Sequence, residues 1–252
     1  MKKYMTLFFI LTSLLACDIT ETAQPTIADY SLQLISAQHI SVPEPSGLTF
    51  DPTNNCLWTV SDETGQIYQL DLNGDVSQIL DFVGSNLEGI AFDKLEDCLW
   101  IVEEEERNLI KVSLEGKELA RYGQLIPGYD NSGLEGICLD PESNIFLLKE
   151  KNPGQFIELN TDKSVKEIID LDFADDYSGM VAADDGRFWI LSDQAEAIFL
   201  WSAESGVSIQ LAISIDKPEG IAFDAINSNL YIISDSENKL YHYKLINNSA
   251  RL

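Results

Sequence analysis

A six-residue motif recurs along this chain at nearly constant spacing. It reads Glu-Gly-Ile-Ala-Phe-Asp at residues 88–93 and 219–224, and Glu-Gly-Ile-Cys-Leu-Asp at 135–140. Weaker copies begin at Ser46 and Ser178, so that successive glycines stand 42, 47, 43 and 41 residues apart. A repeat of about 40–45 residues has the length of one blade of a β-propeller. The spacing therefore predicts a ring of similar units.

Each copy has the pattern of four short antiparallel strands. In the second copy, residues 87–93 form an apolar run and 98–102 a second one, 109–114 alternate between apolar and polar residues, and 118–122 form a weaker fourth segment. Polar turns separate these segments, which is the pattern of successive β-strands. The chain contains no amphipathic helix of useful length, so we predict an all-β protein.

The number of copies predicts the number of blades. Five copies predict a β-propeller of five four-stranded blades; the alternative is six blades, for which the spacing leaves no room. The fifth copy ends after its third strand, near Leu245, while residues 30–40 alternate like a strand. We expect residues 30–40 to close the ring as the outermost strand of the last blade, because closure removes an open sheet edge. Residues 30–252 then form one domain.

The second strand of every copy carries one aromatic residue, which we expect to pack in the core between blades. These residues are Trp58, Trp100, Phe146, Trp189 and Tyr231. Four positions after each aromatic residue stands an acid, and this offset is the same in all five copies. A carboxylate that recurs at one place in every blade marks a ring of acids on the folded propeller.

Two sets of side chains are therefore expected on one face. The second strand runs antiparallel to the first, so its end returns beside the start of the first. The inner set precedes the motif glycine and consists of Ser46, Glu88, Glu135, Ser178 and Glu219. The outer set follows the second strand and consists of Asp62, Glu104, Glu150, Asp193 and Asp235.

Carboxylates that converge on a narrow channel repel one another, and a bound cation relieves that repulsion. Ligands that are all oxygen atoms favour Ca²⁺, with Mg²⁺ as the alternative. Zinc is disfavoured, because the chain has only two histidines, both in expected peripheral strands. We assign the inner set as cation ligands; the alternative is ion pairing with Lys149, Lys151, Lys217 or Arg107. For the outer set we expect the acids to cap the turns, with metal or substrate contact for a minority of the five.

The repeated [Glu/Ser]-Gly-[Ile/Leu/Met] motif and the strand with its aromatic residue and terminal acid resemble the SdiA-regulated lipoprotein family over about residues 30–245. That family consists of β-propellers of the bacterial envelope. The chain is more distantly similar to the gluconolactonase and regucalcin propellers and to esterase-like phytases. In the lactonase group the residue before the glycine is a divalent-metal ligand, which implies this role for Glu88, Glu135 and Glu219, and by position for Ser46 and Ser178. The lactonase ligands mix Glu, Asn and Asp, whereas this chain has three Glu and two Ser.

The N-terminal segment has the pattern of a lipoprotein signal. Lys2 and Lys3 precede an apolar run over residues 5–15, and Leu-Leu-Ala-Cys at 14–17 resembles the lipobox of bacterial lipoproteins. We therefore expect a signal peptide over residues 1–16, lipidation of Cys17 and a flexible tether over 17–29; an ordinary cleaved signal is the alternative. Asp18 resembles the signal that retains lipoproteins in the inner membrane, so we expect a membrane-anchored envelope protein.

Composition limits the partners and the chemistry. With 42 acidic and 16 basic residues, the chain should repel nucleic acid; we expect a monomer whose partner is a small molecule or an envelope protein. The sequence favours free thiols at Cys56, Cys98 and Cys138 over a disulfide.

No Gly-x-Ser-x-Gly motif is present. The enzymatic hypothesis is metal-assisted hydrolysis of a lactone, ester or phosphoester, with Asp193 or Asp235 as general base. The alternative is a non-catalytic binding propeller with a structural metal.

Overall fold

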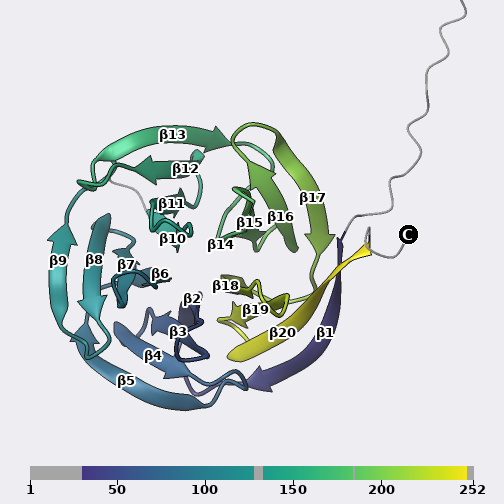
Figure 1. Ribbon diagram of the computed structural model, residues 1–252, viewed down its shortest axis with the longest axis horizontal. Helices are drawn as coiled ribbons and strands as arrows, with labels where there is room; N and C mark the ends of the chain where they lie inside the picture. Colours follow the sequence, from purple (N-terminus) through teal and green to yellow (C-terminus); the bar gives the residue numbers. More distant parts are fainter. Residues whose placement is uncertain (1–29, 128–132, 184, 249–252) are drawn as a thin grey trace, which may run out of the picture.

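The computed structural model describes residues 30–127, 133–183 and 185–248. These residues form twenty strands in five four-stranded antiparallel sheets, arranged around a central axis as a five-bladed β-propeller (Figure 1). The described residues contain no α-helix and so none that could cross a membrane. The predicted all-β fold with five blades is confirmed, and the six-bladed alternative is wrong.

The strands of each blade follow one another outward from the axis. Blade 1 consists of β2 (Pro45–Asp51), β3 (Cys56–Ser61), β4 (Gln66–Leu70) and β5 (Val76–Val83). Blade 2 consists of β6 (Leu87–Asp93), β7 (Cys98–Glu103), β8 (Asn108–Ser113) and β9 (Glu118–Tyr122). Blade 3 consists of β10 (Leu134–Leu139), β11 (Ile145–Lys149), β12 (Gly154–Leu159) and β13 (Val165–Leu171). Blade 4 consists of β14 (Gly179–Ala182), β15 (Phe188–Ser192), β16 (Ala197–Ser202) and β17 (Gly206–Ala212).

The last blade joins the two ends of the chain. It consists of β18 (Pro218–Asp224), β19 (Asn229–Ser234), β20 (Lys239–Asn247) and β1 (Tyr30–His39). β1 pairs antiparallel with β20 from Tyr30 opposite Asn247 to His39 opposite Lys239. The expected closure by the N-terminal strand is therefore confirmed, and β20 loses the open edge that it would otherwise present.

The motif glycines allow the inner strands to approach the axis. A Cβ atom on Gly47 would lie 2.3 Å from the carbonyl oxygen of Glu88 in the next blade. A Cβ atom on Gly89 would lie 2.8 Å from the carbonyl oxygen of Glu135, and one on Gly220 would lie 2.6 Å from the carbonyl oxygen of Ser46. Backbone meets backbone at these positions, so only glycine fits. This packing explains why the motif is built on glycine.

The core lies between the blades and contains the second-strand aromatic residues. Trp58, Trp100, Trp189 and Tyr231 expose 1–2% of their surface, and Phe146 exposes 9%. The expected core packing of these side chains is confirmed. Cys56, Cys98 and Cys138 are free and buried among them, and burial raises the pKa of the Cys98 thiol to about 11.

The last residue of the motif caps the turn that follows the inner strand. Asp93 is 2% exposed, and its Oδ1 accepts the backbone N–H groups of Leu95 at 3.0 Å and Glu96 at 3.1 Å. Its Oδ2 accepts Trp100 Nε1–H at 3.2 Å, and its Oδ1 also accepts the Ser143 hydroxyl of blade 3 at 2.7 Å. One carboxylate thus joins a turn, a core aromatic residue and a neighbouring blade.

Replacing Asp93 with alanine is expected to lower the free energy of unfolding by about 2 kcal/mol, because it leaves several buried donors without an acceptor. Urea unfolding measures the loss. Asp81, an exposed residue of β5, is the matched control, and Asp81→Ala should change the free energy by less than about 0.5 kcal/mol. Equal effects of the two substitutions would show that the capping role is unimportant.

Candidate functional site

All ten members of the inner and outer sets line one cavity on the axis of the propeller. The cavity has a volume of about 390 Å³, and its walls carry ten carboxyl side chains and two lysines. We call this end of the ring the acidic face. The other lining residues are Glu44, Pro45, Lys151, Asp176, Gln194 and Lys217. Repetition of position along each blade is enough to bring these side chains together.

A local irregularity precedes the motif glycine in four blades. The pairing register of the inner strand shifts between Leu87 and Ile90 in blade 2 and between Leu134 and Gly136 in blade 3, with equivalent shifts in blades 1 and 5. A β-bulge turns a side chain out of the regular alternation. Because Glu88 and Glu135 lie within these irregular steps, the bulge accounts for their position on the cavity wall.

A third repeated position, not predicted from the sequence, lies at the acidic face, and three of its members, Glu44, Asp176 and Lys217, line the cavity. It lies two residues before each member of the inner set, and its members are Glu44, Asn86, Gly133, Asp176 and Lys217. Its carbonyl accepts the N–H of an outer-set residue in four blades, for example Glu104 from Asn86 at 3.0 Å and Asp235 from Lys217 at 3.1 Å. The constant distance of two residues from the inner set could have been seen in the sequence. The position was not recognised because its five residues have no chemical property in common.

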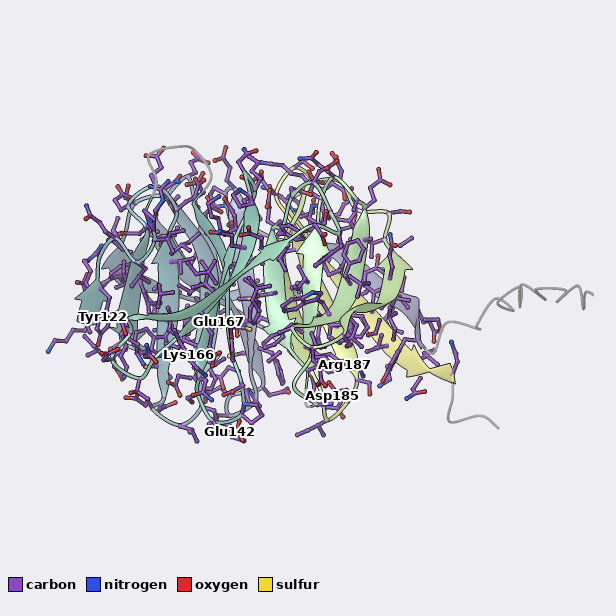
Figure 2. All side chains as sticks on the ribbon, turned by 90° about the horizontal axis from the view of Figure 1, so that it is seen from above. Tyr122, Glu142, Lys166, Glu167, Asp185 and Arg187 are labelled. Carbon is purple, nitrogen blue, oxygen red and sulfur yellow. The ribbon has the colours of Figure 1, made fainter. Side chains whose placement is uncertain are left out.

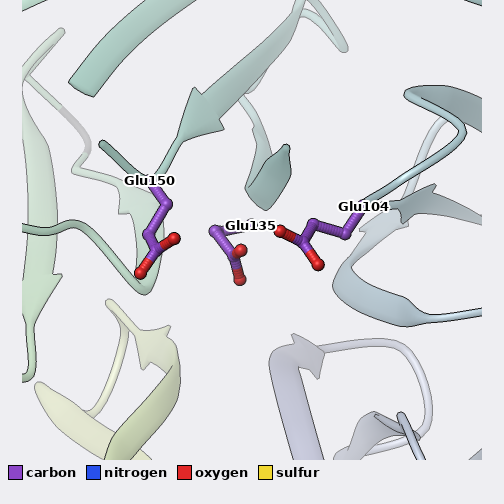
Figure 3. A group of neighbouring side chains, drawn as sticks. All are labelled: Glu104, Glu135 and Glu150. Carbon is purple, nitrogen blue, oxygen red and sulfur yellow. The ribbon is translucent and has the colours of Figure 1, made fainter. Parts of the chain in front are cut away.

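Three carboxylates come close enough to hold one ion. Ligand oxygens of Glu104, Glu135 and Glu150 all lie within 4.8 Å of one another (Figure 3). Glu135 belongs to the inner set, whereas Glu104 and Glu150 belong to the outer set and come from blades 2 and 3. The group therefore combines one member of the inner set, which we assigned as cation ligands, with two members of the outer set, for which we expected metal contact in a minority.

Two of these glutamates have partners that fix their position. Glu104 Oε2 accepts Asn86 Nδ2–H at 2.7 Å, and its Oε1 accepts the Gly133 N–H at 3.2 Å. Glu150 forms an ion pair with Lys151. Glu135 forms no side-chain hydrogen bond or ion pair within the described ranges 30–127, 133–183 and 185–248. Burial, and then the charges of neighbouring glutamates, raise the pKa of Glu135 well above its usual range.

The rest of the inner set is held by hydrogen bonds and partial ion pairing. Ser46 donates its hydroxyl to Glu88, and Ser178 donates its hydroxyl to the Pro218 carbonyl at 2.7 Å. Burial raises the pKa of Glu88 to about 8. Burial also raises the pKa of Glu219 to about 8, although Lys217 Nζ lies 3.8 Å from its carboxylate. The two serines thus support their neighbours, and the glutamates carry the acidity of the inner set.

Turn capping was the role expected for the outer set, but in three blades the residue before the acid caps the turn. Ser61 accepts the Thr64 N–H at 3.0 Å, and Ser192 and Ser234 accept equivalent N–H groups at 3.2 Å. The adjacent acids Asp62, Asp193 and Asp235 are left to face the cavity. Burial is the main cause that raises the pKa of Asp62 and of Asp193, while Asp235 is ion-paired with Lys217.

Comparison with known proteins agrees with the fold. The model of the SdiA-regulated family matches residues 23–244. No curated protein shows significant sequence similarity to the chain. Glutaminyl cyclase from Myxococcus xanthus superposes with a TM-score of 0.67 at 14% identity, covering 86% of this chain and 97% of the cyclase.

Two further structures are similar over a smaller part of their length. A catalytically inactive virginiamycin B lyase from Staphylococcus aureus with quinupristin has a TM-score of 0.53 at 17% identity; the match covers 80% of this chain and 66% of the lyase. A chain of a nidogen/laminin complex has a TM-score of 0.56 at 16% identity; the match covers 79% of this chain and 74% of the chain from the complex. Identities this low establish a shared propeller architecture and leave the chemistry to the site itself.

Proposed function

The chain belongs to the SdiA-regulated family, and from that premise we propose that it is an envelope β-propeller that binds a divalent cation, Ca²⁺, in the cavity of the acidic face. The observation that carries the proposal is the group formed by Glu104, Glu135 and Glu150, whose oxygens lie within 4.8 Å of one another. Two oxygens bound to one Ca²⁺ at 2.3–2.6 Å can be at most about 5.2 Å apart. The upper limit on the spacing is compatible with three ligands of one Ca²⁺.

The ligand chemistry of the group favours Ca²⁺ over Mg²⁺. Mg²⁺ demands near-octahedral geometry at about 2.0–2.1 Å and is usually bound through one or two carboxylates, whereas Ca²⁺ accepts several carboxylates in a flexible shell. Glu135 and its neighbours are half-buried carboxylates whose mutual repulsion a cation would relieve. Glu104, Glu135 and Glu150 would hold the ion, with water completing the six to eight ligands that Ca²⁺ accepts.

Replacing Glu135 with glutamine is expected to weaken Ca²⁺ binding at least tenfold, because the affinity of an oxygen site depends on its number of charged ligands. Isothermal titration calorimetry measures the affinity. Glu63→Gln is the control, since Glu63 is exposed on the same face beside Asp62 and does not line the cavity; it should bind Ca²⁺ like the wild type. Equal affinities of wild type and Glu135→Gln would refute the site.

Metal-assisted hydrolysis is the second candidate, and one observation favours it. Asp193 lines the cavity with a raised pKa, caused by burial and then by the charges of Asp176 and Asp216. A raised pKa suits a general base that takes a proton from an attacking water. Asp235 is less suitable, because Lys217 already pairs with it. A bound Ca²⁺ would supply polarisation of the carbonyl or phosphoryl oxygen of a lactone, ester or phosphoester.

A substrate screen separates this candidate from a non-catalytic propeller with a structural metal. Lactones, aryl esters and phosphodiesters are tested with and without Ca²⁺, on the wild type and on Asp193→Asn. Turnover that needs Ca²⁺ and is lost in Asp193→Asn supports the hydrolase. Ca²⁺ binding without turnover of any of these substrates supports a propeller that holds a small molecule or an envelope protein in its acidic cavity.

The envelope location rests on the N-terminal segment, which lies outside the described residues. We propose that Cys17 carries a lipid that anchors a monomeric propeller to the membrane, with Asp18 favouring the inner membrane. Cys17→Ser should move the protein from the membrane fraction to the soluble fraction, as measured by fractionation and immunoblotting. Retention of the variant in the membrane fraction would contradict lipid anchoring.

A further inference from the structure

We propose that the face opposite the acidic face docks on the lipid bilayer to which the chain is tethered, with the side chains of Leu95 and Ile226 entering its apolar layer. This inference rests on the anchoring at Cys17 proposed above. It concerns a surface that the cation site does not use. The cavity of the acidic face would then open away from the membrane.

An apolar cavity opens on the axis at this second face. It has a volume of about 410 Å³, and its walls are the ends of the inner strands. Leu48, Phe50, Ile137, Met180, Ile221 and Phe223 are among the residues that line it. The two ends of the axis therefore differ in chemistry, because carboxylates dominate one wall, whereas the other is mainly aliphatic and aromatic, with Lys94, Asp140 and Asp224 among its few charged residues.

Two exposed aliphatic side chains stand at the rim of this apolar cavity. Ile226 exposes 88% of its surface and Leu95 exposes 67%, the highest values among the large apolar side chains of the described residues. Both lie in turns after an inner strand, β18 and β6, and both line the cavity. Single exposed aliphatic residues are common. Two of them beside a concave apolar wall form a surface that water solvates poorly.

The chain enters the propeller at this same face. β1 runs antiparallel to β20, and its first residue, Tyr30, lies opposite Asn247. Tyr30 lines a neighbouring cavity together with Ala183, Phe223 and Ala225, which also line the apolar cavity. Residues 17–29 come before Tyr30, and thirteen residues span at most about 45 Å when extended. A lipid on Cys17 would therefore attach the chain to the membrane within about 45 Å of this face.

Charge disfavours contact between the acidic face and an anionic bilayer. The acidic face carries ten carboxyl side chains and two lysines around its cavity, and an anionic membrane surface repels it. The opposite face mixes charges of both signs. Figure 2 shows Glu142, Asp185 and Arg187 along one edge of the propeller, on the side where the yellow end of β20 lies. Arg187 pairs with Asp185, while Asp97 and Glu142 are exposed acids in the turns of the same face, so the docking is carried by the apolar cavity and its rim and not by net charge.

The docking is tested with the full-length lipidated chain in phosphatidylcholine vesicles. A fluorophore is attached to Leu95→Cys or Ile226→Cys, and to Glu63→Cys as the control on the acidic face; the native Cys56, Cys98 and Cys138 are buried. Nitroxide-bearing lipids quench a fluorophore that enters the bilayer. We expect quenching at positions 95 and 226 to exceed that at position 63 at least severalfold.

A second labelled position tests the two side chains themselves. A fluorophore at Glu142→Cys, an exposed site of the same face, should be quenched in the parent chain. The double substitution Leu95→Ser/Ile226→Ser should reduce that quenching, with a loss of about tenfold in surface association for each buried aliphatic side chain. Unchanged quenching at position 142 would overturn the role of Leu95 and Ile226.

The outcomes separate docking from anchoring. If the chain floats with the vesicles but positions 63, 95 and 226 are quenched equally, the docking proposal is overturned and the anchor stands. If the chain does not float with the vesicles, both the anchor and the docking proposal are overturned. Calorimetry with Ca²⁺ reports on the acidic cavity in either case, so a failure here leaves the cation site untouched.

Discussion

Replacing Gly47 with alanine is expected to lower the free energy of unfolding by more than about 4 kcal/mol, which is enough to unfold a protein of ordinary stability. The added Cβ would lie 2.3 Å from the carbonyl oxygen of Glu88, 2.8 Å from Gly89 Cα and 2.8 Å from the Ile90 nitrogen. All three atoms belong to the backbone, so no side-chain rotation can relieve the overlap. Blades 1 and 2 would have to separate at the axis, where every blade meets its neighbours.

The matched control for this substitution is Gly136→Ala at the equivalent position of blade 3. There the nearest atoms to an added Cβ belong to the Leu148 side chain, at 3.1 and 3.2 Å. A side chain can shift by a few tenths of an ångström, so we expect a smaller loss. Urea unfolding followed by circular dichroism compares the two variants. A Gly47→Ala protein as stable as Gly136→Ala would show that the inner strands can move apart at little cost.

Without a cation, the propeller is expected to lose stability as the pH rises from about 5 to about 8. Burial raises the pKa values of Glu88 and Glu219 from 4.5 to about 8. Between these values the folded protein still holds protons that the unfolded chain has released, so raising the pH favours unfolding. Each unit of pKa difference corresponds to about 1.4 kcal/mol. Since both side chains are half-buried, we expect a total loss on the order of 4 kcal/mol.

Unfolding curves at several pH values, with a chelator or with excess Ca²⁺, measure this dependence. Ca²⁺ at a hundred times its dissociation constant should restore about 2.7 kcal/mol at pH 8. The double variant Glu88→Gln/Glu219→Gln should show a flatter profile, whereas Glu63→Gln should follow the wild type. Stability that stays constant or increases from pH 5 to pH 8 in the chelator would contradict the expected protonation.

The repeats make most of the fold predictable from the sequence. Each blade is encoded locally, by an apolar run, a polar turn and an aromatic residue at fixed offsets, so the strand order follows without knowledge of distant contacts. Closure by β1 was predictable because the fifth copy lacks a fourth strand and residues 30–40 alternate like one. The common face of the inner and outer sets follows from the antiparallel pairing of adjacent strands.

The grouping of the carboxylates within the cavity was not predictable. Sequence position fixes where Glu104 stands along blade 2, but not how far its side chain reaches toward Glu135 in blade 3. That reach depends on the bulge before Gly136 and on the hydrogen bonds from Asn86 and Gly133 that orient Glu104. Lys217 was expected only as a possible ion-pair partner of the inner set. Its ion pair with Asp235 leaves Asp193 as the better candidate for a general base.

The pairing of β1 with β20 also determines the order in which the molecule can be completed. Leu32 lies opposite Leu245, at the other end of the chain. During synthesis β1 is made first, yet its partner strand is among the last segments to appear. Blades 1 to 4 can assemble in sequence from neighbouring strands, whereas blade 5 waits for a contact of very long range, the kind that slows folding. Until then β1 is an unpaired strand with alternating apolar residues, which exposes the nascent chain to aggregation.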